Sequence, residues 1–511
     1  MNNKRVKNVS VVMIITIVSK VLGFVRDIVL ADCFGSCTIT DAYYVAQTIP
    51  EFLFSLVVQS ISIGFIPIYS QIFSSDGKKK ADKFTNNIIK LCVILVLVIV
   101  AVVNIFTREI VYVFASGFNE EGINIASGFV RITTFALIFR IIVSVYNAYL
   151  HANDHFISSA FNGIILDIVI IISIIVAFYT NEYGLAFGLV AAAFLQFAAL
   201  VPVVVKRKSK MNLSLRGLFN SDTKKMFSLI LPVLLGVGAN QINVLIDKTM
   251  ASSIVGGISA LNYANKVDNV LENIIVLSLA TVMFPAFAKE VANKNMNGYK
   301  NSIKTSLLVV CVTMIPCAFF AFTFSTEAIT VLFARGAFDS TAIANVSAAM
   351  KYYSVGLLFL SINAVLTRAL YALNKVTVVS VTTTLSVFVN VGMNILLKPL
   401  LGIGGLALAT SISNIFITMC LLIMLKRFTK ISFAKEISFD FLKISVACII
   451  MAFCSYLLYE QVFNDINYII GTLLSCTAGA LIFVILELIM KEKLIFDIKN
   501  QFFKLIKTKL K

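Results

Sequence analysis

The sequence predicts an all-α integral membrane protein with about fourteen transmembrane helices, arranged as two parallel six-helix repeats around a central cavity, plus a C-terminal helix pair. The first observation behind this fold class is composition: 59% of the 511 residues are hydrophobic and only 14% are charged. Soluble domains carry charge on about a quarter of their residues, so an ordinary soluble enzyme is excluded. The other two observations are a series of long apolar runs and a repeat at a spacing of about 220 residues.

The apolar runs define the membrane segments in chain order. A bilayer core about 30 Å thick requires about 20 residues of helix. Pro50 and Pro67 are expected to bend the second segment or to end its transmembrane part. The predicted segments are 9–32, 40–74, 85–107, 122–150, 156–180, 184–205, 226–253, 258–287, 302–324, 342–372, 376–399, 402–425, 438–459 and 466–490.

The first run follows several basic residues and could be mistaken for a secretory signal peptide. It is too long for the apolar core of such a peptide, and it carries Lys20, Arg26 and Asp27. It also lacks a small-x-small cleavage site. We therefore assign it to the first membrane helix.

The chain has a large excess of basic residues, with 43 Lys and Arg against 26 Asp and Glu and a formal net charge of +17. Most of them fall in alternate connections, whereas the opposite connections hold only Arg108, Arg335 and Lys398. Lys and Arg are retained on the cytoplasmic side, so both termini are predicted to be cytoplasmic. The excess indicates loops that face anionic phospholipid, and we expect no nucleic-acid partner.

One segment, in which polar residues interrupt an apolar run, occurs twice. Residues 107–118 (TREIVYVFASGF) resemble residues 325–338 (STEAITVLFARGAF), and the same spacing aligns Asp27 with Asp247 and Tyr44 with Tyr263. Because six helices separate the copies, both halves enter the membrane in the same sense, as in alternating-access transporters. The predicted domains are a first lobe (1–205), a basic cytoplasmic linker (206–225), a second lobe (226–426), helices 13 and 14 (438–490) and a basic amphipathic cytoplasmic tail (491–511).

Charged residues within the predicted helices mark a candidate site. An ionised side chain at the bilayer centre costs about 2.5–3.5 kcal/mol, so it faces a partner or a water-filled cavity. The first half contains the cations Lys20, Arg26, Arg131 and Arg140 and the carboxylates Asp27, Asp41 and Asp167. The excess of cations favours an anionic substrate, because guanidinium groups bind phosphate oxygens in pairs. The alternative is an ion pair that only locks helices, such as Arg26 or Lys20 with Asp41.

Three stretches resemble the MurJ/MviN lipid II flippase family: SKVLGFVRD at 19–27, TDAYYVA at 40–46 and LGIGGLALATS at 401–411. The resemblance extends over nearly the whole chain. It implies a fourteen-helix member of the multidrug/oligosaccharidyl-lipid/polysaccharide exporter superfamily in the bacterial cytoplasmic membrane. Such a protein moves lipid II, the lipid-linked peptidoglycan precursor, from the inner to the outer leaflet by alternating access. We expect a monomer whose helices 13 and 14 form a groove for the lipid tail.

The resemblance also implies the substrate-binding residues Lys20, Arg26, Asp27, Asp41 and Lys266, with Lys20 and Lys266 at positions where the family usually has Arg. Further cavity charges are expected at Arg140, Asp247, Lys248 and Arg368. The family's Pro-Asn-Leu-Leu stretch, which an arginine follows in Gram-negative members, reads PEFLFS at 50–55, so that arginine is missing. This departure leaves another polyprenyl-pyrophosphate-linked saccharide as an alternative cargo.

Other classes of function fit the residues less well. A multidrug exporter needs acidic residues to dominate its cavity, whereas basic residues dominate the first half. A membrane-embedded transferase needs carboxylates or histidines at one interface, and His151, Asp154 and His155 are explained by a solvated turn. No Gly-x-x-x-x-Gly-Lys phosphate loop is present, so ATP hydrolysis is not expected. The nine cysteines lie mostly in apolar runs, and we expect neither a metal nor a cofactor.

Overall fold

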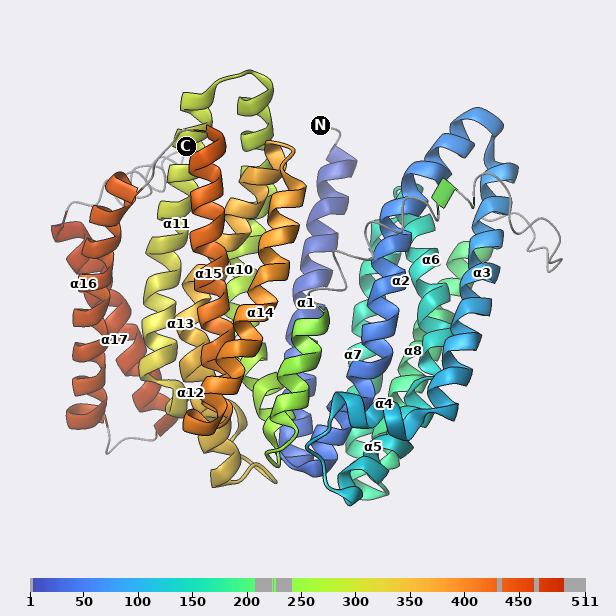
Figure 1. The fold of residues 1–511 in the computed structure, drawn as a ribbon, viewed down its shortest axis with the longest axis horizontal. Coiled ribbons are helices and arrows are strands. Elements are labelled where there is room, and N and C mark those ends of the chain that lie inside the picture. Colours follow the sequence, from blue (N-terminus) through green and yellow to red (C-terminus); the bar gives the residue numbers. More distant parts are fainter. Residues whose placement is uncertain are drawn as a thin grey trace. The chain divides into compact units, whose positions relative to one another are not determined.

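The computed structural model describes residues 3–206, 223, 225–226, 241–429, 434–463 and 468–490. All regular secondary structure in these residues is helical (Figure 1). The helices are α1 (Asn3–Phe34), α2 (Thr38–Asp76), α3 (Lys78–Ile105), α4 (Thr107–Phe114), α5 (Glu120–Thr133), α6 (Ala136–Ala152), α7 (Phe156–Tyr179), α8 (Tyr183–Val205), α10 (Gly257–Ala292), α11 (Met296–Thr323), α12 (Ser325–Phe333), α13 (Ser340–Ala372), α14 (Val376–Leu401), α15 (Ile403–Thr429), α16 (Ala434–Leu458), the π-helix η1 (Tyr459–Phe463) and α17 (Tyr468–Ile489).

The lengths and surfaces of these helices fit a membrane. Within the described ranges, nine helices are long and apolar enough to cross a bilayer, or ten if the bent pair α5 and α6 is one span. Large apolar side chains are exposed on them, for example Phe388 (71%) and Leu400 (77%) on α14. Lipid tails solvate such surfaces, whereas water does not. The prediction of an all-α integral membrane protein is therefore confirmed.

Each predicted membrane segment coincides with helical residues, although for the segment predicted at 226–253 the structure describes only residue 226 and residues 241–253. Most of the predicted linker and the whole predicted tail, 491–511, lie outside the described residues. Pro50 and Pro67 both lie inside α2, which continues past them. Neither proline ends the helix, and the expectation that they bend it or end its transmembrane part stays a prediction.

The helices of the two halves begin at matching positions. α3 begins at Lys78 and α11 at Met296, while α7 begins at Phe156 and α14 at Val376. These spacings are the same repeat of about 220 residues that the sequence predicts. The duplicated segments 107–118 and 325–338 both begin with a short helix, α4 and α12.

The ends of α6 and α13 show the same repeat in backbone detail. Asp154 and Asn374 follow these helices with φ angles of 61° and 58°, in the left-handed region that Asn and Asp tolerate. The next backbone N–H donates to the carbonyl five residues earlier, at 2.8 Å after Asp154 and 2.9 Å after Asn374. This pattern is the Schellman motif, which satisfies carbonyls that a helix end leaves unpaired.

The halves differ where a single segment was expected at 122–150. The structure has two helices there, α5 and α6, bent by 44°, whereas α13 is continuous. The Thr133 hydroxyl donates to the carbonyl of Ala46 on α2 at 2.8 Å, and the Thr134 hydroxyl donates back to Val130 at 2.5 Å. Threonine hydroxyls that bond to helical carbonyls bend helices, which explains the break.

Contacts divide the chain into two compact units, of which unit 1 is Met1–Ser259 with Arg335–Asp339. Inside unit 1, α1 packs on α7, α7 and α6 pack on α8, and α2 packs on α3, α5 and α6. Its core includes the rings of Phe65, Tyr69, Phe84 and Tyr149. Phe65 stacks on both Tyr69 and Phe84, with centroids 5.5 Å apart in each pair. These aromatic contacts fix α2 against α3 and α6.

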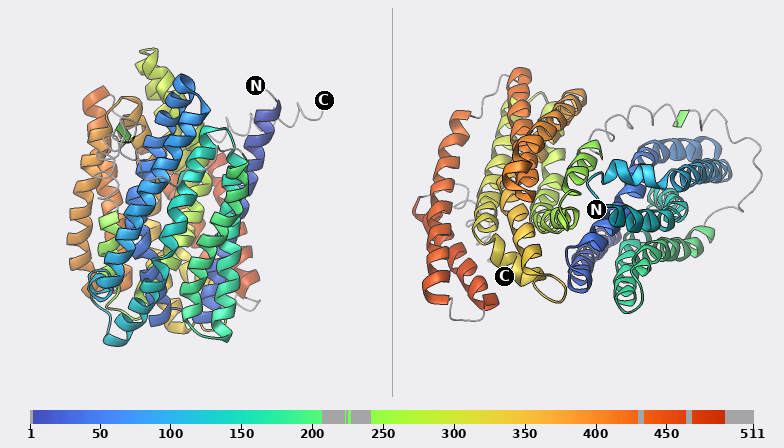
Figure 2. Two further views of the ribbon diagram at one scale, coloured as in Figure 1. Left: turned by 90° about the vertical axis from the view of Figure 1, so that its right-hand side faces the viewer. Right: turned by 60° about the horizontal axis from the view of Figure 1, so that its bottom comes forward.

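Unit 2 is Ala260–Ala334 with Ser340–Lys511. Within it, α13 packs against α11, α14 and α15, and α16 packs against α11 and α17 (Figure 2). The Tyr299 hydroxyl of α11 donates to the carbonyl of Ala369 on α13 at 2.9 Å. Between α14 and α15, the Asn390 amide donates to Thr410 at 3.3 Å. Such interhelical hydrogen bonds stabilise membrane bundles because the alternative is a polar group in hydrocarbon.

Candidate functional site

A buried ion-pair cluster joins α1 to α7 inside unit 1. The Arg26 Nη1 atom lies 2.9 Å from Oδ1 of Asp167, and its Nη2 and Nε atoms lie 3.2 and 3.3 Å from Oδ1 of Asp27. The side chains of Arg26, Asp27 and Asp167 are 11%, 2% and 8% exposed. All three nitrogens of the guanidinium group therefore contact a carboxylate. Sequence reasoning placed Arg26 at an anion site but offered Asp41 as its alternative partner, and that pairing is wrong.

Small residues allow α1 and α7 to approach closely at this cluster. A Cβ atom on Gly163 of α7 would overlap the Ser19 hydroxyl of α1, and one on Gly23 would lie 3.6 Å from the Asp167 carboxylate. The Ser19 hydroxyl is also 3.5 Å from the second oxygen of Asp167. Close backbone approach at small residues is typical of packed membrane helices. It brings the short Asp167 side chain within reach of Arg26.

Two aromatic residues and a second arginine lie beside the cluster. Tyr43 of α2 is 2% exposed, and its hydroxyl has no hydrogen-bond partner among the described residues. Arg26 and Arg140 both lie close enough to interact electrostatically with that hydroxyl. Arg140 of α6 also lies 5.4 Å from the ring centre of Phe54, a cation–π distance. The polar groups of α1, α2, α6 and α7 therefore converge.

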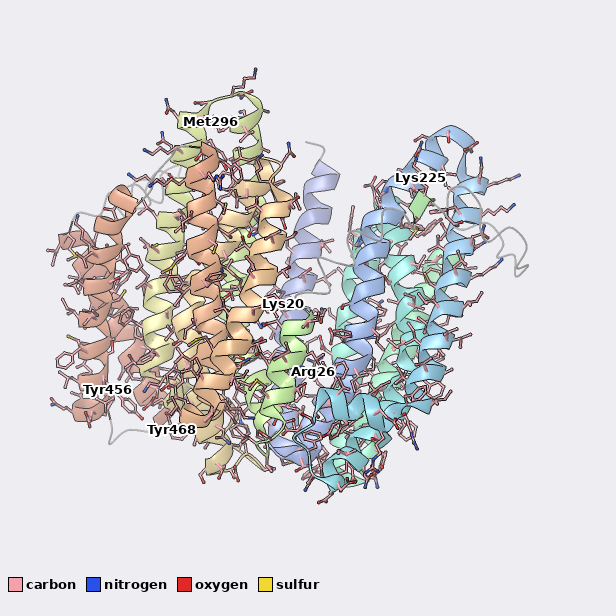
Figure 3. The ribbon with its side chains drawn as sticks, in the orientation of Figure 1. Lys20, Arg26, Lys225, Met296, Tyr456 and Tyr468 are labelled. Carbon is pink, nitrogen blue, oxygen red and sulfur yellow. The ribbon has the colours of Figure 1, made fainter. Side chains whose placement is uncertain are left out.

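Lys20 lies on the same helix as Arg26 (Figure 3). It is exposed, and in the described part of the chain it forms no hydrogen bond or ion pair. Lys20 is thus a free cation on the helix that carries Arg26. The predicted first-half cation Arg131 is likewise exposed, on α5.

Asp41, in the first turn of α2, is 1% exposed and does not join this cluster. Its Oδ1 atom accepts hydrogen bonds from the backbone N–H and the hydroxyl of Ser259, both at 2.7 Å. The Ser259 hydroxyl also lies 2.8 Å from that of Ser36, which follows α1. Asp41 therefore connects the end of α1 and the start of α2 to the first turn of α10.

Four glycines, Gly35, Gly117, Gly256 and Gly336, surround these hydrogen bonds, and we call them the glycine junction. A Cβ atom on Gly256 would overlap the carbonyl of Ser36, and one on Gly336 would overlap the carbonyl of Asp32. Gly336 and Gly256 also have φ angles of 55° and 74°. Only glycine permits this close approach in this conformation. The duplicated turns of the two sequence halves thus pack on each other within unit 1.

The remaining predicted charges are distributed over both units. Lys248 and Asp247 are half-buried in unit 1, and the Lys248 ammonium lies 2.5 Å from the Thr48 hydroxyl of α2. Lys266 and Arg368 are half-buried in unit 2, on α10 and α13. Arg368 donates to the carbonyl of Ala364 on its own helix at 2.8 Å.

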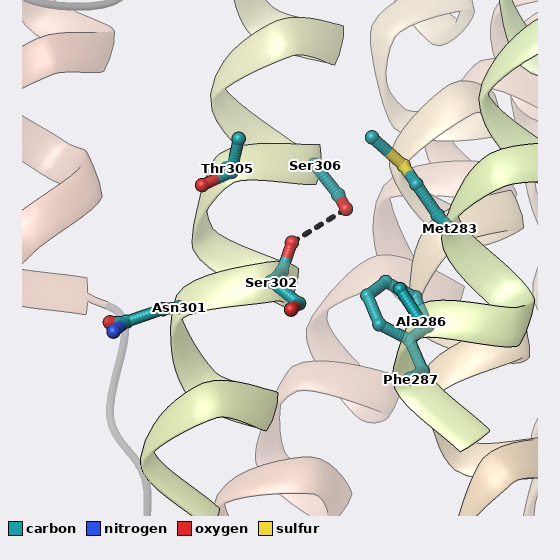
Figure 4. Close-up of a pocket in the computed structure, with 7 residues that line it drawn as sticks. All are labelled: Met283, Ala286, Phe287, Asn301, Ser302, Thr305 and Ser306. Carbon is teal, nitrogen blue, oxygen red and sulfur yellow. Dashed lines mark hydrogen bonds between the residues drawn. The ribbon is translucent and has the colours of Figure 1, made fainter. Parts of the chain in front are cut away.

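A cavity of about 310 Å³ lies between α10 and α11 of unit 2 (Figure 4). One wall is apolar and comes from α10, while the other carries hydroxyl and amide groups of α11. The lining residues are Met283, Ala286, Phe287, Asn301, Ser302, Thr305 and Ser306. None of the predicted substrate-binding residues lines it.

Sequence reasoning missed three residues of these sites. Asp167 was recognised as an intramembrane charge but not as the partner of Arg26, which is 141 residues away. Tyr43 belongs to the TDAYYVA motif, which indicated the family but assigned no function to this tyrosine. Ser259 carried no signal, because a serine in an apolar chain is common.

A duplicated helical bundle with exposed apolar flanks and ion pairs buried between apolar helices is typical of a multi-pass membrane transporter. The family model described as "Lipid II flippase MurJ" matches residues 30–487. The chain therefore belongs to the lipid II flippase MurJ family.

Individual relatives agree with this assignment. The chain is 28% identical to a probable lipid II flippase MurJ of Buchnera aphidicola subsp. Baizongia pistaciae, over 71% of this chain and 72% of the relative. It is 26% identical to that of Thermotoga maritima, over 93% of this chain and 94% of the relative.

A solved structure described as lipid II flippase MurJ in an inward closed conformation is similar with a TM-score of 0.81 and 25% identity. The match covers 95% of this chain and 99% of that one. An inward-facing multidrug resistance MATE transporter has a TM-score of 0.69 at 14% identity, over 82% of this chain and 98% of that one, which supports the fold alone.

Proposed function

We propose that this protein moves lipid II from the inner to the outer leaflet of the bacterial cytoplasmic membrane by alternating access. The observation that carries the proposal is the family match over residues 30–487, combined with the buried Arg26 cluster in the first half. Uncompensated charges on the head group cannot cross hydrocarbon, so a polar route through the protein is required. The polyprenyl tail remains in lipid.

The substrate site is proposed to contain Lys20, Arg26, Asp27, Asp41 and Lys266, with Arg140, Asp247, Lys248 and Arg368 as further cavity charges. Lys20 supports this proposal because it is an exposed cation on α1, the helix that also carries Arg26. Arginine and lysine bind pyrophosphate oxygens through charge-assisted hydrogen bonds. Tyr43 adds a buried hydroxyl that can donate to an anion beside Arg26.

The glycine junction and the Asp41–Ser259 hydrogen bonds are proposed to close the outer end of the route. They join residues 32–41 to residues 256–259 and to Ala337 of the second sequence half, through polar contacts that can form and break. Opening this end requires these contacts to separate. Their breakage would be offset by water and by head-group contacts.

We also propose the domain boundaries, the oligomeric state and the membrane orientation that the sequence predicts. The two lobes are 1–205 and 226–426, joined by the linker 206–225. The last two predicted membrane segments (438–490) bind the lipid tail. The protein acts as a monomer with both termini in the cytoplasm, and its basic loops and its tail (491–511) contact anionic phospholipid.

The test is export in living cells. The chain is expressed in a bacterium whose own lipid II flippase is depleted, and outer-leaflet lipid II is measured with a membrane-impermeant amine-reactive label. We expect the chain to restore labelling and growth. Persistent accumulation of unlabelled lipid II, with normal membrane levels of the chain, would overturn this cargo. Export of a different polyprenyl-pyrophosphate saccharide in the same cells would support the alternative cargo.

A further inference from the structure

We propose that Asp167 is the exchangeable counter-anion of Arg26. It neutralises Arg26 while the protein is empty, and a phosphate oxygen of the substrate takes its place when the head group binds. This inference rests on the proposed function, because it requires a substrate that carries phosphate.

The geometry separates the roles of the two carboxylates. Asp27 follows Arg26 directly on α1, so a rigid movement of α1 carries both residues together. Asp167 belongs to α7 and makes the shortest contact, at 2.9 Å to Nη1. A relative movement of α1 and α7 therefore breaks the Asp167 pair and leaves the Asp27 pair intact.

Electrostatics favours exchange over simple release. When the Asp167 pair opens, Arg26 keeps Asp27 but loses its shortest carboxylate contact, so less of its desolvation cost is offset. A phosphate oxygen accepts the same hydrogen bond from Nη1 as a carboxylate oxygen does, so the positive charge of Arg26 stays compensated. Asp167 can return when the substrate leaves, which gives the empty protein a stable state and lowers the barrier to release.

The surroundings of Asp167 allow this movement. The Ser19 hydroxyl lies 3.5 Å from Oδ2 of Asp167 and can donate to the displaced carboxylate. The facing positions on α1 and α7 include Gly23 and Gly163, which let the two helices approach closely at Asp167. Arg140 of α6 and Tyr43 of α2 lie close enough to interact, and the Tyr43 hydroxyl, which has no hydrogen-bond partner among the described residues, can donate to an incoming anion.

The experiment measures binding of farnesyl pyrophosphate to the purified full-length protein in detergent by calorimetry. Removal of a competing carboxylate should strengthen binding, so Asp167→Asn is expected to bind about tenfold more tightly than the wild type, the equivalent of one charged hydrogen bond. A purely structural pair predicts the opposite, since its loss would loosen the site. In an Arg26→Ala background, Asp167→Asn should change nothing, because the two residues act through one contact.

Asp82→Asn is the matched control. It removes another fully buried carboxylate of unit 1, on α3, which is not paired with Arg26 in the structure. Its affinity for farnesyl pyrophosphate should equal that of the wild type. An Asp167→Asn variant that binds no more tightly than the wild type overturns the counter-anion role. A wild type that does not bind farnesyl pyrophosphate at all instead contradicts the anion site of the proposed function.

A second measurement does not depend on how Asp167→Asn folds. A Ser19→Cys variant, with Asp167 unchanged, places a thiol between α1 and α7. Farnesyl pyrophosphate should increase its rate of maleimide labelling several-fold as the Asp167 pair opens. An unchanged rate under saturating ligand would also overturn the exchange.

Discussion

Asp41 and Ser259, 218 residues apart in the sequence, are joined by two hydrogen bonds of 2.7 Å to a single carboxylate oxygen. Both groups are buried, at 1% and 0% exposure. Charge-assisted hydrogen bonds of this kind are about twice as strong as neutral ones. The end of α1 and the start of α2 are therefore firmly attached to the first turn of α10.

This attachment should be breakable during the transport cycle, and a disulfide there should stop transport. We expect the double variant Ser36→Cys/Ser259→Cys to be inactive when oxidised and active after reduction, because the two native hydroxyl oxygens lie only 2.8 Å apart. The neighbouring Cys33 and Cys37 are replaced by serine to prevent mispairing. Lipid II export is measured before and after reductant, with each single variant as control. Export at the wild-type rate by fully crosslinked protein would show that this contact does not open.

Gly336→Ala should loosen the glycine junction, because the new methyl group would overlap the carbonyl of Asp32. Maleimide labelling of the native free thiols Cys33 and Cys37 should then be faster than in the wild type. Gly402→Ala is the control, since Gly402 has a similar φ angle of 57° but no atom within 4 Å of the added Cβ. It should strain the backbone without changing the labelling. Equal labelling in both variants would assign the effect to backbone strain alone.

Arg26→Ala should abolish lipid II export at normal membrane levels, because it removes the buried guanidinium group and leaves Asp27 and Asp167 without their cation. Export is measured in the flippase-depleted strain. Arg131→Ala removes an exposed arginine of α5 and should retain activity. Full activity of the Arg26 variant would remove this residue from the substrate site.

Thr133→Val should destabilise unit 1 by about 1 kcal/mol, since it deletes the hydrogen bond from the α5–α6 break to the carbonyl of Ala46. Thermal unfolding of the purified protein in detergent measures the change. Thr180→Val is the matched control, because the exposed Thr180 hydroxyl bonds only to Val176 of its own helix. If both variants lower the midpoint temperature of unfolding equally, the hydrogen bond from Thr133 to Ala46 of α2 contributes no specific stability.

The sequence alone determined which segments enter the membrane, that the chain is duplicated, and which family it resembles. A long apolar run predicts a membrane segment from its own residues, without knowledge of the rest of the fold. A repeat can be recognised wherever the same polar residues recur at a constant spacing. For the same reason the buried charges could be named in advance, Arg26 and Asp167 among them.

The tertiary structure alone decided which of these charges meet. Arg26 pairs with Asp167 and not with Asp41, because close packing of α1 on α7 at small residues brings that carboxylate within 2.9 Å. Asp41 instead bonds to Ser259, and Thr133 bends one half where the other is straight. An ion pair depends on distances of a few ångströms between distant parts of the chain, and hydropathy along the sequence does not record those distances.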